Sequence, residues 1–363
     1  MKLQVTQENL NRALGTVARV ANSRGTLPIL ANVLIKTTNN RLSIAATNLD
    51  IGITQYIGAK VADEGAITVP ARLMQDFISS LPSGVIELDL DESKLKISTD
   101  QYQSTINGIL ADDFPVMPAI TAGKSWKVSG EQLKKGLQQV VFAASNDEAR
   151  PVLTGVLIHS SDGKLYLAAT DSYRLAEKEI GASKDEVSML VPATAMHDLL
   201  RILGDGEETV HVTHDEQQVL FKVGDVELVA RLLEGKYPDY RKLIPSSFAV
   251  EVTLKRSELL NVTKVSSLFA RESAGSVTLK VDEAAQSLSI RSIASQLGEN
   301  TASAAGKVSG SGEITLNSRY LLDALGALSG DEVTFGFNGK LEATCLRDAK
   351  NSDYTHIIMP LKS

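Results

Sequence analysis

The chain of 363 residues is long enough for two to four domains, each with a core of its own. Its hydrophobic content of 43% and charged content of 22% are those of an ordinary globular protein. The N-terminus is polar, Cys345 is the single cysteine, and no run approaches roughly 18 apolar residues. These features exclude a signal peptide, a disulfide within the chain and a membrane-spanning helix, so we expect a cytoplasmic protein without a membrane partner. The net charge of −7 argues against a surface coated in nucleic acid.

A strand followed by a helix is predicted where the chain begins, and the same pattern returns twice. Apolar residues at strand spacing and then at helix spacing occur in "LQVTQENLNRALGTVARV", "WKVSGEQLKKGLQQVVF" and "VTLKRSELLNVTKVSSLF". Val5 in the first segment corresponds to Val128 in the second, 123 positions later, and Leu254 in the third follows after a further 126. The sequence therefore contains three related units.

A second helix is predicted in the middle of each unit. It lies in "VPARLMQDFISSL", "VPATAMHDLLRIL" and "LNSRYLLDALGAL", which keep an aspartate at the equivalent positions Asp76, Asp198 and Asp323. Units of about 120 residues are too long for a solenoid repeat and long enough to own a core. We therefore expect three domains, with the boundaries 1–122, 123–246 and 247–363.

Strands fill the rest of each unit. The segment "RLSIAATNLD" from Arg41 is nearly repeated 123 positions later as "KLYLAATDSY" from Lys164, and both are typical of a strand that follows a tight turn. The predicted hairpin turns are Asn39-Asn40, Asp91–Ser93, Asp162-Gly163 and Asn338-Gly339. The fold class is therefore α+β, with two helices in each domain and strands after each helix.

The basic residues are concentrated in the predicted helices. The six helical segments are 6–20, 71–81, 130–145, 193–203, 255–271 and 318–328. They carry eleven Lys and Arg against six Asp and Glu, a net charge of +5 in a chain of net charge −7. Either this difference reflects only the helix preference of Arg and Lys, or the helices form one cationic face. Such a face would attract phosphates without base specificity.

Signals for catalysis are weak. The sequence contains neither a phosphate-binding G-x-x-x-x-G-K-[ST] loop nor a G-x-G-x-x-G motif. The odd spacing of His211 and His214 sends their side chains to opposite faces of a strand, which disfavours a shared metal. Asp89 and Asp91 flank a hairpin turn and could in principle hold a metal for nuclease chemistry, although solvated carboxylates are expected there. We predict no catalytic residue, no metal and no cofactor.

Several motifs together resemble a known family. Three tandem domains that carry "RGTLPIL", "VPAR", "LAATDSYRLA", "YPDYRKLIP" and a terminal "IIMPLKS" resemble the bacterial sliding clamps, the beta subunits of DNA polymerase III. The resemblance covers the whole chain. It implies two β-α-β-β-β units in each domain and a homodimeric ring of six domains, with helices around the hole and sheets outside. It also implies a non-enzymatic processivity factor that encircles double-stranded DNA without reading its sequence.

The resemblance also implies sites for DNA and for a second copy of the chain. Arg24, Arg72 and Arg150 match positions that contact DNA, although Pro151 and Val152 stand where some clamps have aromatic residues. The dimer junction is expected where "QYQSTING" of one chain meets "SQLGENTAS" of the other, near Ile106, Leu268 and Phe269.

A pocket for short peptide motifs is the third site that the resemblance implies. Its expected partners are the replicative DNA polymerase, the clamp loader and repair proteins, which would insert Leu or Phe side chains. The matching residues are Leu153, Thr170, Ser172, Tyr173, Arg174, Leu175, Pro238, Lys242, Leu243, Asn317, Tyr320, Leu341, Ala343, Ile358, Met359, Pro360 and Leu361. Pro360 is expected to end the last strand, and the three residues after it are too few to form a core. The alternative hypotheses are a scaffold that never binds DNA and a metal-dependent nuclease.

Overall fold

A computed structural model describes residues 1–21, 27–115, 120, 123–206, 209–295 and 298–362. The fold is α+β, as predicted, and β-α-β-β-β occurs six times in its element order, twice within each predicted domain, with the short strands Lys60–Asp63, Ile109–Leu110 and Lys307–Ser309 between some of these units. The described residues form two compact units, 1–131 with 197–232 and 132–196 with 233–363. None of the helices in these ranges is long and apolar enough to cross a membrane.

Six α-helices occur in the described ranges, and each lies within a predicted helical segment. They are α1 Gln7–Val17, α2 Ala71–Ser80, α3 Gly130–Val140, α4 Ala193–Ile202, α5 Arg256–Phe269 and α6 Ser318–Ala327. In α1, Leu10, Leu14 and Val17 are buried at intervals of four and three residues, which places them on one face of the helix. The hydrophobic periodicity of this segment therefore corresponds to the buried face of α1.

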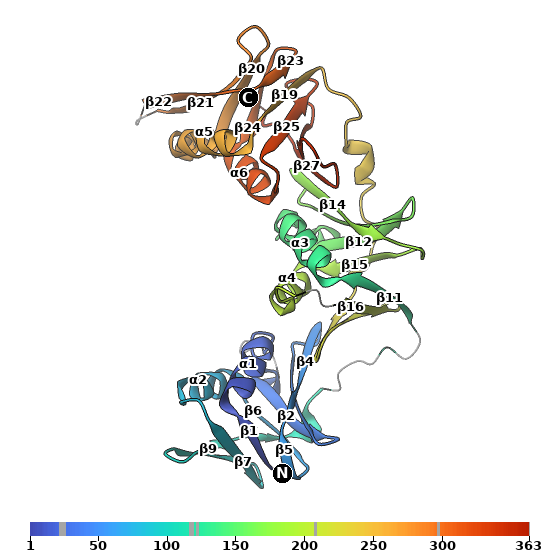
Figure 1. Ribbon diagram of the computed structural model, residues 1–363, viewed down its shortest axis with the longest axis vertical. Helices are drawn as coiled ribbons and strands as arrows, with labels where there is room; N and C mark the ends of the chain where they lie inside the picture. The colour runs from blue at the N-terminus through green and yellow to red at the C-terminus, as the bar shows by residue number, and fades with distance from the viewer. Residues whose placement is uncertain (22–26, 116–119, 121–122, 207–208, 296–297, 363) are drawn as a thin grey trace. The chain divides into compact units, whose positions relative to one another are not determined.

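The first compact unit contains two antiparallel sheets. A five-stranded sheet has the order β5-β1-β7-β8-β9, and a nine-stranded sheet has the order β10-β6-β2-β3-β4-β18-β17-β16-β11. The strands are β1 Lys2–Thr6, β2 Asn32–Thr38, β3 Arg41–Thr47, β4 Ile51–Gly58, β5 Lys60–Asp63, β6 Ala66–Pro70, β7 Val85–Asp91, β8 Lys94–Ser98, β9 Gln103–Asn107, β10 Ile109–Leu110, β11 Lys124–Ser129, β16 Thr209–His214, β17 Gln218–Val223 and β18 Val226–Arg231. Helix α1 packs against α2 and against strands of both sheets (Figure 1).

The second compact unit also has two sheets. Their orders are β15-β12-β13-β14-β27-β26-β25-β19-β23 and β22-β21-β20-β24. The strands are β12 Gly155–Ser161, β13 Lys164–Thr170, β14 Arg174–Ala182, β15 Ser188–Pro192, β19 Val250–Lys255, β20 Ser276–Asp282, β21 Ser287–Ala294, β22 Gly298–Ala305, β23 Lys307–Ser309, β24 Gly312–Asn317, β25 Glu332–Phe337, β26 Thr344–Asp348 and β27 Tyr354–Ile358. Helix α5 packs against α6 and against both sheets (Figure 1).

The nine-stranded sheets join strands from different predicted domains. β4 pairs with β18 in the first unit, and β14 pairs with β27 in the second. Because backbone hydrogen bonds cross these junctions, the compact units do not coincide with the predicted domains. The boundaries after residues 122 and 246 therefore stay a prediction.

The two near-identical decapeptides build the same turn. Thr47 and Thr170 each accept a hydrogen bond from the backbone N–H two residues later and donate to the carbonyl four residues later. The next side chain, Asn48 or Asp171, accepts from two further backbone N–H groups. The third residue of each turn has the same positive φ, 80° at Leu49 and 79° at Ser172. The repeat in the sequence is thus first a requirement of the fold.

Most of the predicted turns are present, and one is wrong. Asn39-Asn40, Asp91–Ser93 and Asp162-Gly163 connect paired strands. Asn338-Gly339 does not form a two-residue hairpin, because β25 ends at Phe337 and β26 begins only at Thr344. The Asn338 side chain instead accepts from the Ala249 N–H at 2.7 Å and donates to the Ser247 carbonyl at 3.0 Å. Contacts distant in sequence have overridden the local turn preference.

Candidate partner-binding site and nucleic-acid contacts

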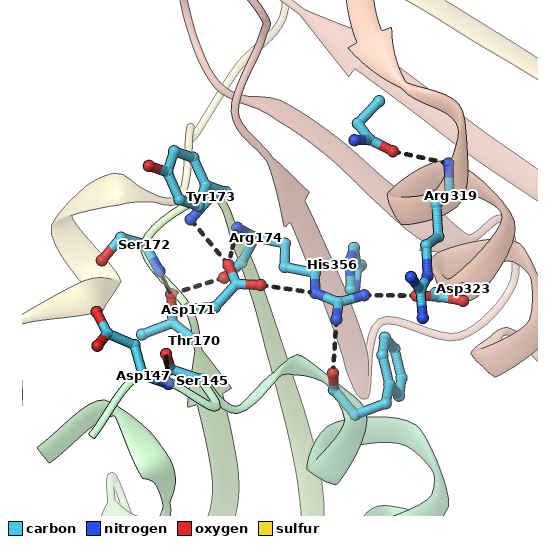
Figure 2. A network of polar contacts seen from close by, with 12 residues as sticks. Ser145, Asp147, Thr170, Asp171, Ser172, Tyr173, Arg174, Arg319, Asp323 and His356 are labelled. Atoms are coloured by element: carbon cyan, nitrogen blue, oxygen red, sulfur yellow. Dashed lines mark hydrogen bonds and ion pairs between the residues drawn. The ribbon is translucent and has the colours of Figure 1, made fainter. Parts of the chain in front are cut away.

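Arg174 lies at the centre of a polar network in the second compact unit. Its guanidinium donates from Nε to Asp171 at 3.1 Å and from Nη1 to Asp323 at 2.6 Å. Nη2 donates to the Phe142 carbonyl at 2.8 Å. Figure 2 shows the guanidinium between the two carboxylates. The Arg174 side chain is only 12% exposed, so its charge is compensated inside the protein and is not offered to solvent.

Aromatic rings complete the surroundings of this guanidinium. Its central carbon lies 5.3 Å from the ring centroid of Phe142 and 4.6 Å from that of Tyr320. His356 stacks on Phe142 and is fully buried. Burial and the nearby Arg174 charge lower the pKa of His356 to about 3, so the imidazole is neutral. Its Nδ1 pairs with the Tyr354 hydroxyl at 2.9 Å.

The turn beside Arg174 presents a predicted pocket residue to solvent. Tyr173 is 59% exposed, and its backbone carbonyl accepts a hydrogen bond from the Met359 N–H at 2.8 Å. Met359 and Pro360 are half-buried. Beyond Pro360, where the sequence predicted too few residues to form a core, the Leu361 N–H donates to the Thr315 carbonyl at 2.9 Å. The chain end is thus held against both the turn and β24.

Two further segments of the predicted pocket meet one hydrophobic cluster. Ile244 and Ala343 both pack against buried residues that include Leu175 and Ile357. Their neighbours in the chain, Leu243 and Leu341, are 55% and 65% exposed. Predicted pocket residues far apart in the sequence are therefore brought to one core, and several of them leave apolar side chains open to solvent.

Side-chain contacts also hold the segment that carries Leu243. The Tyr240 hydroxyl donates to Glu177 at 2.5 Å, and Arg241 Nε donates to the same carboxylate at 3.0 Å. Because Tyr240 donates its single proton to Glu177, His159 Nε2, 2.6 Å from the same hydroxyl, must be the donor of that contact. Burial and the Glu177 charge raise the pKa of Tyr240 above its ordinary value. This network fixes the short helix Tyr240–Leu243 to the sheet.

The predicted pocket residues differ in exposure. Leu153, Thr170, Leu175 and Ile358 are buried and can only support a site from beneath. Pro238, Lys242, Leu243, Leu341, Ser172 and Tyr173 are exposed, and Arg174, Asn317, Tyr320, Ala343, Met359, Pro360 and Leu361 lie between. Lys242 pairs with Asp239 at 2.7 Å.

The three arginines predicted to contact DNA have different surroundings. Arg72 is 96% exposed and only loosely paired with Asp76, at 3.9 Å. Arg150 donates to Asp147 at 3.2 Å and to the Ser172 hydroxyl at 2.9 Å, which ties it to the turn before Arg174. Arg24 lies outside the described residues. The roles of all three stay predictions.

The residues predicted at the dimer junction lie near open sheet edges. β9 is the last strand of its sheet and β22 the last strand of another, as far as the described ranges extend. Leu268 on α5 is 51% exposed and Phe269 is half-buried. Ile106 on β9 is only 6% exposed, so its side chain belongs mainly to the core of its own domain.

Sequence reasoning missed several residues of these sites. Asp171, Asp323 and Phe142 hold Arg174. The sequence signal for Asp171 was that an aspartate stands there in the second decapeptide, where the first has Asn48. A hollow of about 200 Å³ in the first unit was also missed; it is lined by Arg12, Gly15, Thr16, Arg19, Asp198, Arg201 and Ile202. Arg12, Arg19 and Arg201 lie in predicted helical segments, which indicated a cationic face but gave no sign of a hollow.

Residues suited to metal binding or nucleophilic catalysis do not cluster. No group of three or more His, Cys, Asp or Glu side chains could hold a metal in the part of the chain that the structure describes. Cys345 on β26 is 2% exposed, and burial raises the pKa of its thiol to about 11. A thiol that is protonated and shielded from solvent is a poor nucleophile.

Known protein families match successive parts of the chain. Models of the DNA polymerase III beta subunit match the chain three times in succession: the N-terminal domain at residues 1–118, the central domain at 127–239 and the C-terminal domain at 241–362. The chain belongs to the DNA polymerase III beta subunit family. Its members are the beta sliding clamps, so the function is that of a non-enzymatic processivity factor in DNA replication.

Individual relatives are similar over their entire length. The beta sliding clamp of Synechococcus elongatus is 32% identical over 372 residues, covering 100% of this chain and 99% of that protein. The beta sliding clamp of Bacillus subtilis is 29% identical, with 100% of both chains covered. Its crystal structure has a TM-score of 0.96 at 28% identity and covers 100% of this chain and 99% of that one. A sliding clamp from Pseudomonas aeruginosa, solved bound to griselimycin, has a TM-score of 0.95 at 26% identity with full coverage of both chains.

Proposed function

We propose that two copies of this chain close head to tail into a ring around double-stranded DNA. In this ring the surface around Tyr173 captures short peptide segments of the replicative polymerase, the clamp loader and repair proteins. The three domains would be 1–122, 123–246 and 247–363. The observation that carries the peptide site is the group of exposed apolar residues Tyr173, Leu243 and Leu341 on segments joined by one core.

The chemistry of the proposed peptide surface favours apolar ligands. The two cations among the predicted pocket residues, Arg174 and Lys242, already have carboxylate partners within 3.1 Å. A partner would therefore gain little from acidic side chains and more from Leu or Phe side chains that cover the exposed apolar residues. Met359 suits a surface that accepts several partners, because its unbranched side chain repacks easily.

Arginines on the helices, and Arg19 just after α1, support the DNA-binding part of the proposal. Arg12, Arg19 and Arg201 line one hollow together with a single carboxylate, Asp198. Asp198 pairs with Arg201 at 2.9 Å, so one carboxylate faces three guanidinium groups in this hollow. Arg72 adds a nearly fully exposed guanidinium on α2. Such contacts bind phosphates without base specificity, which lets a ring slide.

The proposed junction between copies rests on the open edges β9 and β22. An exposed strand edge carries backbone N–H and C=O groups that can pair with another strand. Two different edges on one chain allow a head-to-tail contact, which closes into a ring when the rotations sum to a full turn. The exposed Leu268 on α5, which packs on β22, would supply apolar contact.

Direct binding tests the peptide surface. Griselimycin and a fluorescein-labelled hexapeptide with two Leu and one Phe are titrated against the purified protein by fluorescence anisotropy and competition. We expect saturable binding of the peptide and its displacement by griselimycin. Replacement of Leu341 by Asp should weaken both by at least about tenfold, because a charge would have to be buried against an apolar ligand. The exposed Leu110 on β10, replaced by Asp, is the matched control. Failure of the unaltered protein to bind either probe would refute the peptide site.

A further inference from the structure

We infer that Asp171 and Asp323 are positioning residues of the peptide surface, which fix it by holding Arg174 between the turn 170–174 and helix α6. The inference deepens the proposed function and rests on it. Its basis is the pairing of one guanidinium with two carboxylates that are 152 residues apart in the sequence.

The guanidinium connects three elements. Asp171 belongs to the turn between β13 and β14, Asp323 to α6, and the Phe142 carbonyl to the short helix Val141–Ala143 that follows α3. The exposed fractions of the two carboxylates are 15% for Asp171 and 36% for Asp323. Charge-assisted hydrogen bonds at such partly desolvated positions are stronger and more directional than neutral ones. The network therefore fixes the turn relative to α6.

The elements held in this way carry the proposed ligand contacts. Asp171 accepts hydrogen bonds from the Tyr173 and Arg174 N–H groups, each at 2.9 Å, while its other oxygen holds the guanidinium. Tyr173 in turn accepts from Met359, so the tail depends on the same turn. On the other side, α6 carries Tyr320, whose ring lies against the guanidinium (Figure 2 shows the turn and α6 on either side of it).

The first decapeptide forms the same turn without an arginine held between two carboxylates. There the turn forms with Asn48 in place of Asp171 and Ile51 in place of Arg174, and the backbone bonds are the same. The turn therefore needs neither the carboxylate nor the arginine. The aspartates at the positions equivalent to Asp323 are Asp76 on α2 and Asp198 on α4, and among the described residues each pairs with an arginine of its own helix, Arg72 or Arg201. The ionic connection from the turn to another helix is thus a feature of the second decapeptide.

Asp171→Asn and Asp323→Asn test the inference in the full-length protein. Each should weaken binding of the labelled hexapeptide and of griselimycin about tenfold, because an ionic contact that holds the surface in its bound form is lost. Asp171→Asn should fold normally, since Asn48 makes the same turn. Asp323→Glu, which keeps the carboxylate, should restore affinity to within about threefold of the unaltered protein. The dimer mass of every variant should stay unchanged.

Substitutions at the corresponding positions of the first domain are the controls. Asn48→Asp and Asp76→Asn change the same functional groups in the same local structures and should leave peptide affinity unchanged. Equal affinity of Asp171→Asn, Asp323→Asn and the unaltered protein would overturn the inference, and so would an equal loss in the controls. Absence of probe binding by the unaltered protein would instead refute the proposed peptide site itself.

Discussion

His356 is buried at the centre of the second compact unit and neutral in the folded protein. Its folded pKa of about 3 lies well below the ordinary value of 6.5. Between these values the unfolded chain binds more protons than the native state, so stability is full above pH 6.5 and falls as the pH drops through this window. For this group alone the loss between pH 7.5 and 5 should be about 2 kcal/mol.

Replacement of His356 by Asn should remove that part of the pH dependence. Asn keeps an acceptor for the Tyr354 hydroxyl but does not titrate, so its urea midpoint should change less between pH 7.5 and 5 than that of the unaltered protein. Urea unfolding at a series of pH values gives the difference. Parallel pH profiles for the two proteins would show that His356 does not carry the effect.

Arg72 is the described arginine best placed to test the DNA contacts. Because its side chain is 96% exposed, Arg72→Glu should leave the melting temperature and dimer mass nearly unchanged. It should weaken DNA binding and lower the salt slope by about one for each protomer, as expected for a lost phosphate contact. Lys60→Glu on the exposed strand β5 makes the same charge change and should have little effect. Equal effects of the two variants would mean that only net charge matters.

At the scale of elements, the tail after β27 is predicted to be part of the peptide surface. Deletion of residues 359–363 removes Met359 and the Leu361 contact with Thr315. It should lower affinity for the labelled hexapeptide by at least about thirtyfold, or 2 kcal/mol, while the dimer persists. Truncation after Leu361 is the control and should bind normally. Loss of the dimer in the longer deletion would identify the tail as a folding element.

Helix α5 and the edge strand β22 should form one side of the dimer junction. Replacement of the exposed Leu268 by Asp would bury a charge against an apolar partner, so we expect monomers of 38.9 kDa at micromolar concentration. Leu110→Asp, at a similarly exposed leucine on β10, should remain dimeric. Mass photometry distinguishes the two states, and a dimeric Leu268→Asp variant would move the junction elsewhere.

The elements themselves were largely predictable from the sequence, because hydrophobic spacing and glycine or asparagine turns act locally. Asn338-Gly339 was misread for the opposite reason: residues 247 and 249, about 90 positions earlier, capture the Asn338 side chain. The residues after Pro360 were expected to be too few to form a core, and their anchor is Thr315, which only the tertiary fold brings near. Arg174 was found by family resemblance, whereas its partner Asp323 lies 149 residues away and no local pattern connects the two.

At the scale of the whole molecule, three related domains account for both the fold and its proposed use. Repetition gives each domain two β-α-β-β-β units, and the proposed second copy would pair at β9 and β22, which end their sheets within the described ranges. Divergence within the repeat gives the second domain the Asp171–Arg174 pair and the exposed Tyr173. The excess of basic residues on the helices fits a surface that meets DNA phosphates while the rest of the chain is acidic.

Retention on circular DNA tests the central claim most directly. The labelled protein is assembled on nicked circular DNA with a bacterial clamp loader, isolated from free protein, and followed before and after the circle is cut once. We expect slow loss from the circle and rapid loss from the linear product, because a closed ring that binds phosphates without sequence preference slides off a free end. Equal retention on circular and linear DNA, or no retention on either, would contradict the account.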